Sequence, residues 1–286
     1  MGEKRPHASE SESESESGSS HRTESRASDR GDRHLNSKQT DGSDSDDDSV
    51  GSNEIVNVDF EFFDPQPIDF HAMKRMFEGS FGDDSDQFNT SALVDLILSQ
   101  PEIGSTVKMD DDSDPYAFMT VLSTRRDSEV ITQLCQYLVK KAGPKAPALS
   151  QLLDTHHVGL LFSERVINMP PQVVVPMLRM LMTEIEKAQG FDFEYFVLVC
   201  SMYSEVPGDD EPAKACEMDV FVHAEEEFME EFAHLVFDFK FSRLKRVAEA
   251  RNTFADAGLA PSRRCLVIHR SKIDSILARL EDVLEL

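Results

Sequence analysis

The sequence predicts one mixed α/β domain over residues 54–286, preceded by a disordered, acidic, serine-rich tail over residues 1–53. The main observation behind this class is a strand–helix–strand unit. Val158–Ile167 is rich in β-forming residues, Pro170-Pro171 opens a helix, and Phe193–Tyr203 is almost continuously apolar, as in a strand covered on both faces. A helix that connects two such strands normally places them in parallel within one sheet. We therefore expect a central mixed sheet of about six or seven strands flanked by helices.

Two periodicities predict the other elements. Apolar residues that alternate with polar ones indicate strands, and apolar residues three and four positions apart indicate helices. The expected strands are Val56–Phe62, Ser105–Met109, Tyr116–Ser123, Leu235–Phe241 and Arg264–His269. The expected helices lie through Phe70–Phe77, from Thr90 or Ser91 to Leu98, from Ser128 to Val139, around Leu149–Leu153, over Asp219–Ala233, and from a capping pair of Ser271 and Asp274 to Leu284.

Charge sets the expected partners. The 286 residues include 54 acidic and 29 basic side chains, a formal net charge of −25. The tail holds 13 acidic and 7 basic residues, so residues 54–286 carry a net −19. The tail has too few apolar residues to offset the entropy of ordering, and we therefore expect it to be disordered. A body of this sign repels phosphate backbones and attracts basic proteins. We expect a basic protein partner and no direct binding of nucleic acid.

The same survey excludes several other classes. No apolar run approaches the roughly 20 residues of a membrane span, and the first 30 residues contain no secretory signal. The four cysteines lie far apart, without the spacing of a metal site or a disulfide scaffold: Cys135, Cys200, Cys216 and Cys265. This usage fits a reducing compartment. We expect a soluble, monomeric protein of the cytosol or nucleus that does not bind membranes.

No catalytic or metal-binding pattern stands out. The glycine-rich phosphate loops and the nucleophile elbow of hydrolases are missing from the sequence. His156 and His157 are adjacent, so their side chains diverge and cannot readily share a metal; a capped turn before the next strand is the favoured interpretation. The acidic turn at 110–115 imitates the start of a calcium loop but lacks its glycine and its bidentate glutamate.

Two groups of charged residues are candidates for function. Glu164 and Arg165 place one charge on each face of a predicted strand, where an ion pair with a neighbouring element is the favoured interpretation and a binding role is the alternative. Four glutamates face outward on the predicted helix 219–233, and Asp59 and Glu61 lie on the outer, acidic face of the first predicted strand. Our candidates for binding a basic client are therefore Glu226, Glu227, Glu230, Glu231, Asp59 and Glu61. A merely solvated helical face is the simpler interpretation of the glutamates.

The tail contains serines beside acidic residues, with near-strict Ser/Glu alternation over Ser9–Ser20 and an Asp-rich run over Ser43–Ser49. Acidophilic kinases favour such sites, and each phosphate would add about −1.5 to −2 charges. A tail that serves only solubility is an equally good interpretation.

One segment resembles a known family. Gly159-Leu-Leu-Phe-Ser-Glu-Arg-Val-Ile-Asn-Met-Pro-Pro-Gln172, continuing to Pro176-Met177, is similar to the signature of the BCCIP family of nuclear proteins. The signature residues are Gly159, Ser163, Glu164, Arg165, Asn168, Pro170, Pro171 and Gln172. Weaker matches are Val56–Glu61, Ile103-Gly104-Ser105 and Ala224-Glu-Glu-Glu-Phe228.

The resemblance implies an acetyltransferase-like (GNAT-like) fold without demonstrated catalysis. It implies a nuclear protein that shuttles with the cytoplasm, chaperones a large-subunit ribosomal protein of the subunit interface during ribosome biogenesis, and supports nuclear export of a phosphoinositide kinase. Working acetyltransferases grip a pyrophosphate with backbone N–H groups of a glycine-rich turn. Here that turn has no glycine, and Pro170 and Pro171 lack an N–H, so we expect no cofactor.

The sequence thus favours a non-enzymatic nuclear chaperone and transport adaptor for a basic client. A divergent acyl-CoA-dependent acyltransferase is one alternative. A phosphorylation-controlled, histone-type acidic chaperone that depends on its tail is the other.

Overall fold

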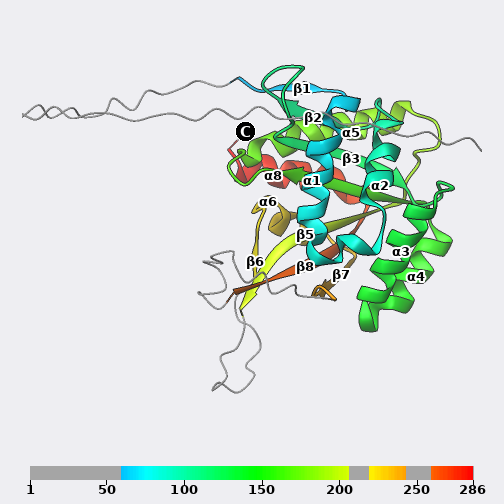
Figure 1. Cartoon of the computed structure of the whole chain (residues 1–286). Helices are drawn as coiled ribbons and strands as arrows, with labels where there is room; N and C mark the ends of the chain where they lie inside the picture. Colours follow the sequence, from blue (N-terminus) through cyan, green and yellow to red (C-terminus); the bar gives the residue numbers. More distant parts are fainter. Residues whose placement is uncertain (1–58, 206–218, 243–258, 286) are drawn as a thin grey trace, which may run out of the picture. The chain divides into compact units, whose positions relative to one another are not determined.

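An eight-stranded mixed sheet forms the centre of the computed structural model, which describes residues 59–205, 219–242 and 259–285 (Figure 1). The strand order is β1-β2-β3-β4-β5-β8-β7, and β6 pairs with the far part of β5. Among the described strands, β4 and β5 form the one parallel pair, as the strand–helix–strand unit predicts. This confirms the mixed α/β class with helices flanking a mixed sheet, whereas the acetyltransferase-like detail stays a prediction.

The strands and helices have the following bounds. The strands are β1 Glu61–Phe63, β2 Ser105–Lys108, β3 Ala117–Ser123, β4 Val158–Arg165, β5 Tyr195–Glu205, β6 Asp219–Phe221, β7 Leu235–Phe239 and β8 Leu259–His269. The α-helices are α1 Phe70–Phe81, α2 Thr90–Leu98, α3 Glu129–Lys141, α4 Ala146–Thr155, α5 Val174–Lys187, α6 Glu225–Glu230 and α8 Ile273–Val283. Short 3-10 turns include η1 Pro67–Asp69 and η4 Pro171–Val173.

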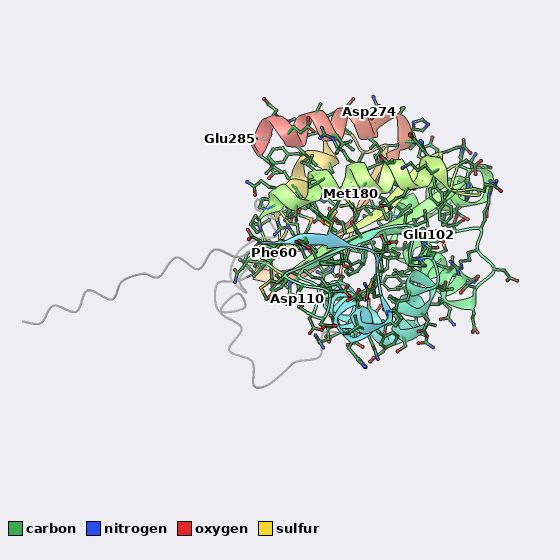
Figure 2. All side chains as sticks on the ribbon, turned by 90° about the horizontal axis from the view of Figure 1, so that it is seen from above. Phe60, Glu102, Asp110, Met180, Asp274 and Glu285 are labelled. Carbon is green, nitrogen blue, oxygen red and sulfur yellow. The ribbon has the colours of Figure 1, made fainter. Side chains whose placement is uncertain are left out.

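Helices cover both faces of the sheet and enclose two apolar cores. Helices α1 to α4 lie on one face, and α5 and α8 lie on the other (Figure 2). The first core includes Phe77 and Leu93, both fully buried, and the second includes Leu178 and Leu181 of α5. In α5 the buried residues recur at helical spacing, so one apolar face explains why this segment is a helix on the sheet. No helix of the described ranges has the length and apolarity that a bilayer crossing requires.

The predicted helix 219–233 is wrong in extent. Its first three residues form β6, which pairs antiparallel with Met202–Ser204 of β5, and α6 covers only Glu225–Glu230. After α6 the amides of Phe232 and Ala233 bond to carbonyls three residues earlier, so the helix tightens and stops. Pairing with a distant strand therefore overrode the local helical spacing, and it also raised the strand number from the expected six or seven to eight.

Smaller differences concern the ends of elements. β8 begins at Leu259 rather than Arg264 because it pairs with the full length of β5. The expected capping pair of Ser271 and Asp274 does not form; the His269 side chain accepts the Ser271 amide instead. Several predictions lie outside the described residues: the tail, the strand start at 56–58, and Cys216.

A buried ion pair ties the first strands to the turn before α1. Lys108 Nζ lies 2.8 Å from Asp69 Oδ1, and both side chains are 0% exposed. Lys108 also donates to the Asp111 carbonyl at 3.1 Å, and Asp69 accepts the Gln66 amide at 2.9 Å. A buried charge without its partner is costly, so the two residues stabilise each other's position.

We predict that Lys108→Met lowers the free energy of unfolding by about 3–5 kcal/mol, because it leaves the Asp69 carboxylate buried and unpaired. The double variant Lys108→Met/Asp69→Leu should recover most of this loss. Urea denaturation measures both. As a control, Lys74→Met, which breaks the half-exposed Lys74–Glu78 pair, should change stability by less than about 1 kcal/mol. A double variant no more stable than Lys108→Met would contradict the assignment.

Candidate functional site: the cavity where β4 and β5 diverge

The parallel strands β4 and β5 pair over only part of their length. Val158–Leu161 pair with Tyr195–Leu198, but beyond this point β4 stays with β3 up to Arg165, while β5 pairs with β6 and β8. The two strands thus separate in the middle of the sheet. Side chains from both faces can meet in this gap, which a continuous sheet would keep apart.

A cavity of about 530 Å³ lies at the divergence. Its walls come from α1, β4, β5, β8 and the segment after β6. The polar and charged lining residues are Ser80, Asp83, Glu164, Arg165, Ser201, Tyr203, His223 and Arg263. Ile167 also lines the cavity and is 70% exposed, so the cavity reaches the surface. Its volume is in the range of small-ligand sites.

The two arginines of the cavity wall are already engaged. Arg165 binds Glu225 of α6 through two parallel contacts, Nε–Oε1 at 2.8 Å and Nη2–Oε2 at 2.7 Å, and its Nη1 donates to the Met169 carbonyl at 2.7 Å. Their side chains are only 7% and 3% exposed, so this is a buried bidentate pair of the kind predicted for Arg165. Arg263 donates to the carbonyls of Ser80, Ser262 and Gly79.

Glu164 has no such arginine clamp. It lies on the opposite face of β4 from Arg165, beside Ser80 of α1, whose hydroxyl donates to the Met76 carbonyl at 3.0 Å. Burial raises the pKa of the Glu164 carboxyl to about 7, although the Ser80 side chain and the charge of Arg263 both act to lower it. The group is therefore largely neutral below pH 7.

His223 completes the polar wall, and the buried Glu226 lies near Glu164. His223 Nδ1 and Glu226 Oε2 are buried and have no hydrogen-bond partner, and the residues are 5% and 3% exposed. Burial lowers the pKa of His223 to about 4, so its ring is neutral. Burial, followed by the charges of Glu164 and Glu225, raises the pKa of Glu226 well above its usual range. Buried polar atoms are normally paired, so unpaired ones beside a cavity indicate a place for a ligand.

The structure corrects the predicted glutamate surface. Glu226 is buried, and burial raises its pKa well above the usual range, so it adds no exposed carboxylate to the surface. Glu230 binds Arg264 at 2.9 Å, and Arg264 also binds Asp219 and Asp238. The hydrogen bond to Asp238 is the largest cause that raises the pKa of the Arg264 guanidinium. The charges of these carboxylates are therefore largely neutralised by Arg264 within the molecule. Glu227 remains exposed as predicted, and Glu231 is exposed beside Arg279.

The other two predicted client-binding residues lie on an exposed surface at the β1 edge of the sheet. Asp59 and Glu61 are exposed beside Phe60 and Phe62, which are 37% and 39% exposed, and Phe60 and Asp110 appear on the same side of the molecule (Figure 2). We call this the β1 surface: Asp59, Phe60, Glu61, Phe62, Met109, Asp110, Asp111 and Asp112. Sequence reasoning identified its carboxylates but not the apolar residues among them.

The β1 surface continues toward the cavity. The Phe60 ring contacts the Tyr116 ring at a centroid distance of 5.4 Å, and the Val166 amide donates to the Tyr116 carbonyl at 2.8 Å. Val166 is 40% exposed, and the next residue, Ile167, lines the cavity. An apolar path therefore connects the acidic edge with the cavity.

The turn between β4 and α5 does not fit the pyrophosphate of an acyl-CoA. Pro170 and Pro171 have no N–H, and the amides of Val173 and Val174 donate to the carbonyls of those two prolines. The donors that would cradle a phosphate are thus missing or used. The chain packs closely along β4 as well, since a Cβ on Gly159 would lie 2.5 Å from Val121 Cγ2.

The remaining signature residues have local roles or face solvent. Ser163 lies in β4 opposite Met119 of β3, and Asn168 and Gln172 are exposed in the turn that follows. Of the signature residues, Glu164 and Arg165 line the cavity.

The histidine pair caps a turn, as expected, and its side chains bind different partners. His156 Nδ1 lies 2.8 Å from Glu194 Oε2, whereas His157 lies between Asp192 at 3.2 Å and the Ser123 hydroxyl at 2.8 Å. This serine–histidine–aspartate order resembles a hydrolase triad, but the Asp192 side chain is 91% exposed and its charge is screened by water. The contacts hold the segment before β5 against the end of β3. Within the described residues, no group of three or more His, Cys, Asp or Glu side chains could hold a metal.

Glu164 makes the stability of the protein depend on pH. A carboxyl whose pKa is raised by folding, here from 4.5 to about 7, contributes stability that is fully present below 4.5 and is lost as the pH rises through 7. At each pH we compare the unfolding free energy of Glu164→Gln with that of the unmodified chain. We predict that this difference shifts in favour of Glu164→Gln by about 2–3 kcal/mol when the pH rises from 4.5 to 8. Urea denaturation at both pH values measures this difference. The exposed Glu231→Gln should show no such gain, and a pH-independent difference for Glu164→Gln would refute the assignment.

Comparisons with known proteins agree with the resemblance of the signature segment. The family model described as BCCIP matches residues 55–229. Protein bcp1 of Schizosaccharomyces pombe is 37% identical over 260 residues, which cover 82% of this chain and 92% of that protein. Protein bcp1 of Aspergillus fumigatus is 37% identical over 263 residues, covering 83% and 90%. The crystal structure of BCP1 from Saccharomyces cerevisiae matches with a TM-score of 0.61 at 25% identity and covers 85% of this chain and 96% of that one. The chain belongs to the BCCIP family.

Proposed function

We propose that this protein is a non-enzymatic nuclear chaperone and transport adaptor that binds a basic client through the β1 surface. The observation that carries the proposal is the alternation of exposed carboxylates and exposed aromatic rings along Asp59–Phe62. Carboxylates attract a cationic protein and take the place of nucleic-acid phosphates, while the rings bury apolar area on binding.

The location of the candidate surface supports a protein partner. Among the described strands, β1 lies at the edge of the sheet and pairs only with β2. An edge strand presents unpaired backbone groups, and its acidic side chains disfavour pairing with a second copy of the same acidic chain. The β1 surface therefore favours a basic partner over self-association, in keeping with a monomer.

Family membership guides the choice of client. We propose a large-subunit ribosomal protein of the subunit interface as the client, which connects the chain to ribosome biogenesis. A phosphoinositide kinase is a second possible cargo for nuclear export. Both proposals, like the shuttling between nucleus and cytoplasm, rest on the resemblance of the signature segment.

The chemistry of the described residues supports a binding role over acyl transfer. The β4–α5 turn offers no cradle for the pyrophosphate of an acyl-CoA, and both arginines at the cavity are held by protein acceptors. Neither guanidinium fork is free to clamp a phosphate.

We predict that Asp59→Lys/Glu61→Lys weakens binding of the ribosomal client about tenfold or more at low salt and flattens the dependence of affinity on salt. Titration calorimetry with the full chain, at two salt concentrations, measures both. The matched control is Asp95→Lys/Asp154→Lys, the same charge change on α2 and α4, where both residues are exposed. If the two variants lose affinity equally, the binding reflects net charge and the β1 surface is not the site.

The tail distinguishes this proposal from a histone-type chaperone. We expect deletion of residues 1–53 to reduce client affinity only modestly, within about threefold, because the tail adds long-range attraction that salt screens. Calorimetry of the truncated chain, with and without prior treatment by an acidophilic kinase, provides the measurement. Complete loss of binding would instead assign the client to the tail.

A further inference from the structure

We propose that the cavity between β4 and β5 binds a lysine or arginine side chain of the basic client, with Glu164 and His223 as its acceptors. This inference rests on the proposed function, since a basic client must supply the side chain. It adds a specific recognition pocket to a surface that otherwise selects by charge alone.

The balance of donors and acceptors in the wall selects a cation. The donors of Arg165 and Arg263 are taken by Glu225 and by backbone carbonyls, so the wall has few donors to offer an anion. Among the lining residues, His223 Nδ1 is a buried atom without a hydrogen-bond partner, and Glu164 supplies carboxyl oxygens. A ligand that brings N–H groups, such as an ammonium or a guanidinium, can satisfy both.

The length and polarity of the cavity approach suit the same side chain. The exposed Ile167 stands at the cavity, and Met76 lines both the cavity and the shallow depression that contains Tyr116 and Val166. A lysine or arginine places its apolar stem along such residues and its charged end among the acceptors. About 530 Å³ easily accommodates one such side chain.

The groups around the carboxyls determine how the charge of the cation is balanced. The titratable or charged groups that act on Glu164 and Glu226 come from β4, β5, α6 and β8: Arg165, Cys200, Glu225 and Arg263. Asp83, Tyr203 and His223 also line the cavity. Of these, Arg165 is neutralised by Glu225, which leaves Arg263 as the cation that faces the two carboxyls. Burial outweighs the charge of Arg263 and favours the neutral form of Glu164 in the empty cavity, and an incoming cation would favour loss of its proton.

Binding should consequently release protons. We expect the full chain to release about three-quarters of a proton on binding a deca-lysine peptide at pH 6.5, because that is what a carboxyl with a pKa of about 7 holds, and Glu164→Gln to release almost none and to bind roughly tenfold more weakly. Calorimetry in two buffers of different ionisation enthalpy, MES and imidazole, counts the protons.

Three variants make the outcome decisive. Ser201→Leu, which fills the cavity from β5 without removing a charge, should also abolish proton release, whereas the exposed Glu231→Gln should leave it unchanged. Asp59→Lys/Glu61→Lys should weaken binding yet keep the proton count. Equal proton release by the unmodified chain, Glu164→Gln and Ser201→Leu would overturn the cavity assignment while leaving the β1 surface standing. Unchanged affinity of Asp59→Lys/Glu61→Lys with intact proton release would contradict the β1 surface and leave the cavity assignment standing.

Discussion

The buried pair between Arg165 and Glu225 is the interaction on which the rest of the site depends. It joins the end of β4 to the first residue of α6 across the gap that β5 leaves open, and it also holds the Met169 carbonyl before α5. Because both charges are withdrawn from water, neither can be removed or displaced without leaving the other unpaired. The pair therefore fixes α6 at the divergence of the strands, and this position turns Glu226 inward toward Glu164 while Glu230 reaches Arg264.

This arrangement divides the acidic residues into two chemically different populations. Carboxylates at the β1 surface are exposed, and they act over the distance that salt permits. Glu164 and Glu226 are shielded from water, and burial raises the pKa of both carboxyls, that of Glu164 to about 7. A formal charge of −25 counts both populations alike, so it describes the long-range field poorly at the cavity and well at the sheet edge.

The sequence predicts local structure well and the site only in part. β4, α5 and β5 are predictable because their apolar patterns are strong and their neighbours in the chain are their neighbours in space. The segment 219–233 is not, because Phe221 and Phe228 fit helical spacing while pairing with β5, a tertiary contact, decides that β6 is a strand. The same error hid the burial of Glu226. The cavity could not be predicted at all, since it arises from the lateral separation of two strands and gathers residues from six separate segments.

The two regions would contribute to binding in different steps if one client contacts both. Charges at the β1 surface attract a basic protein before contact, so they act mainly on the association rate and weaken with salt. A cation in the cavity would exchange its hydration for the acceptors of Glu164 and His223, so it acts mainly on the dissociation rate and responds to pH. Contacts through Tyr116, Val166 and Ile167 connect the two regions. Capture and retention of a client would then be separately adjustable by salt and by pH, which a uniformly acidic surface could not achieve.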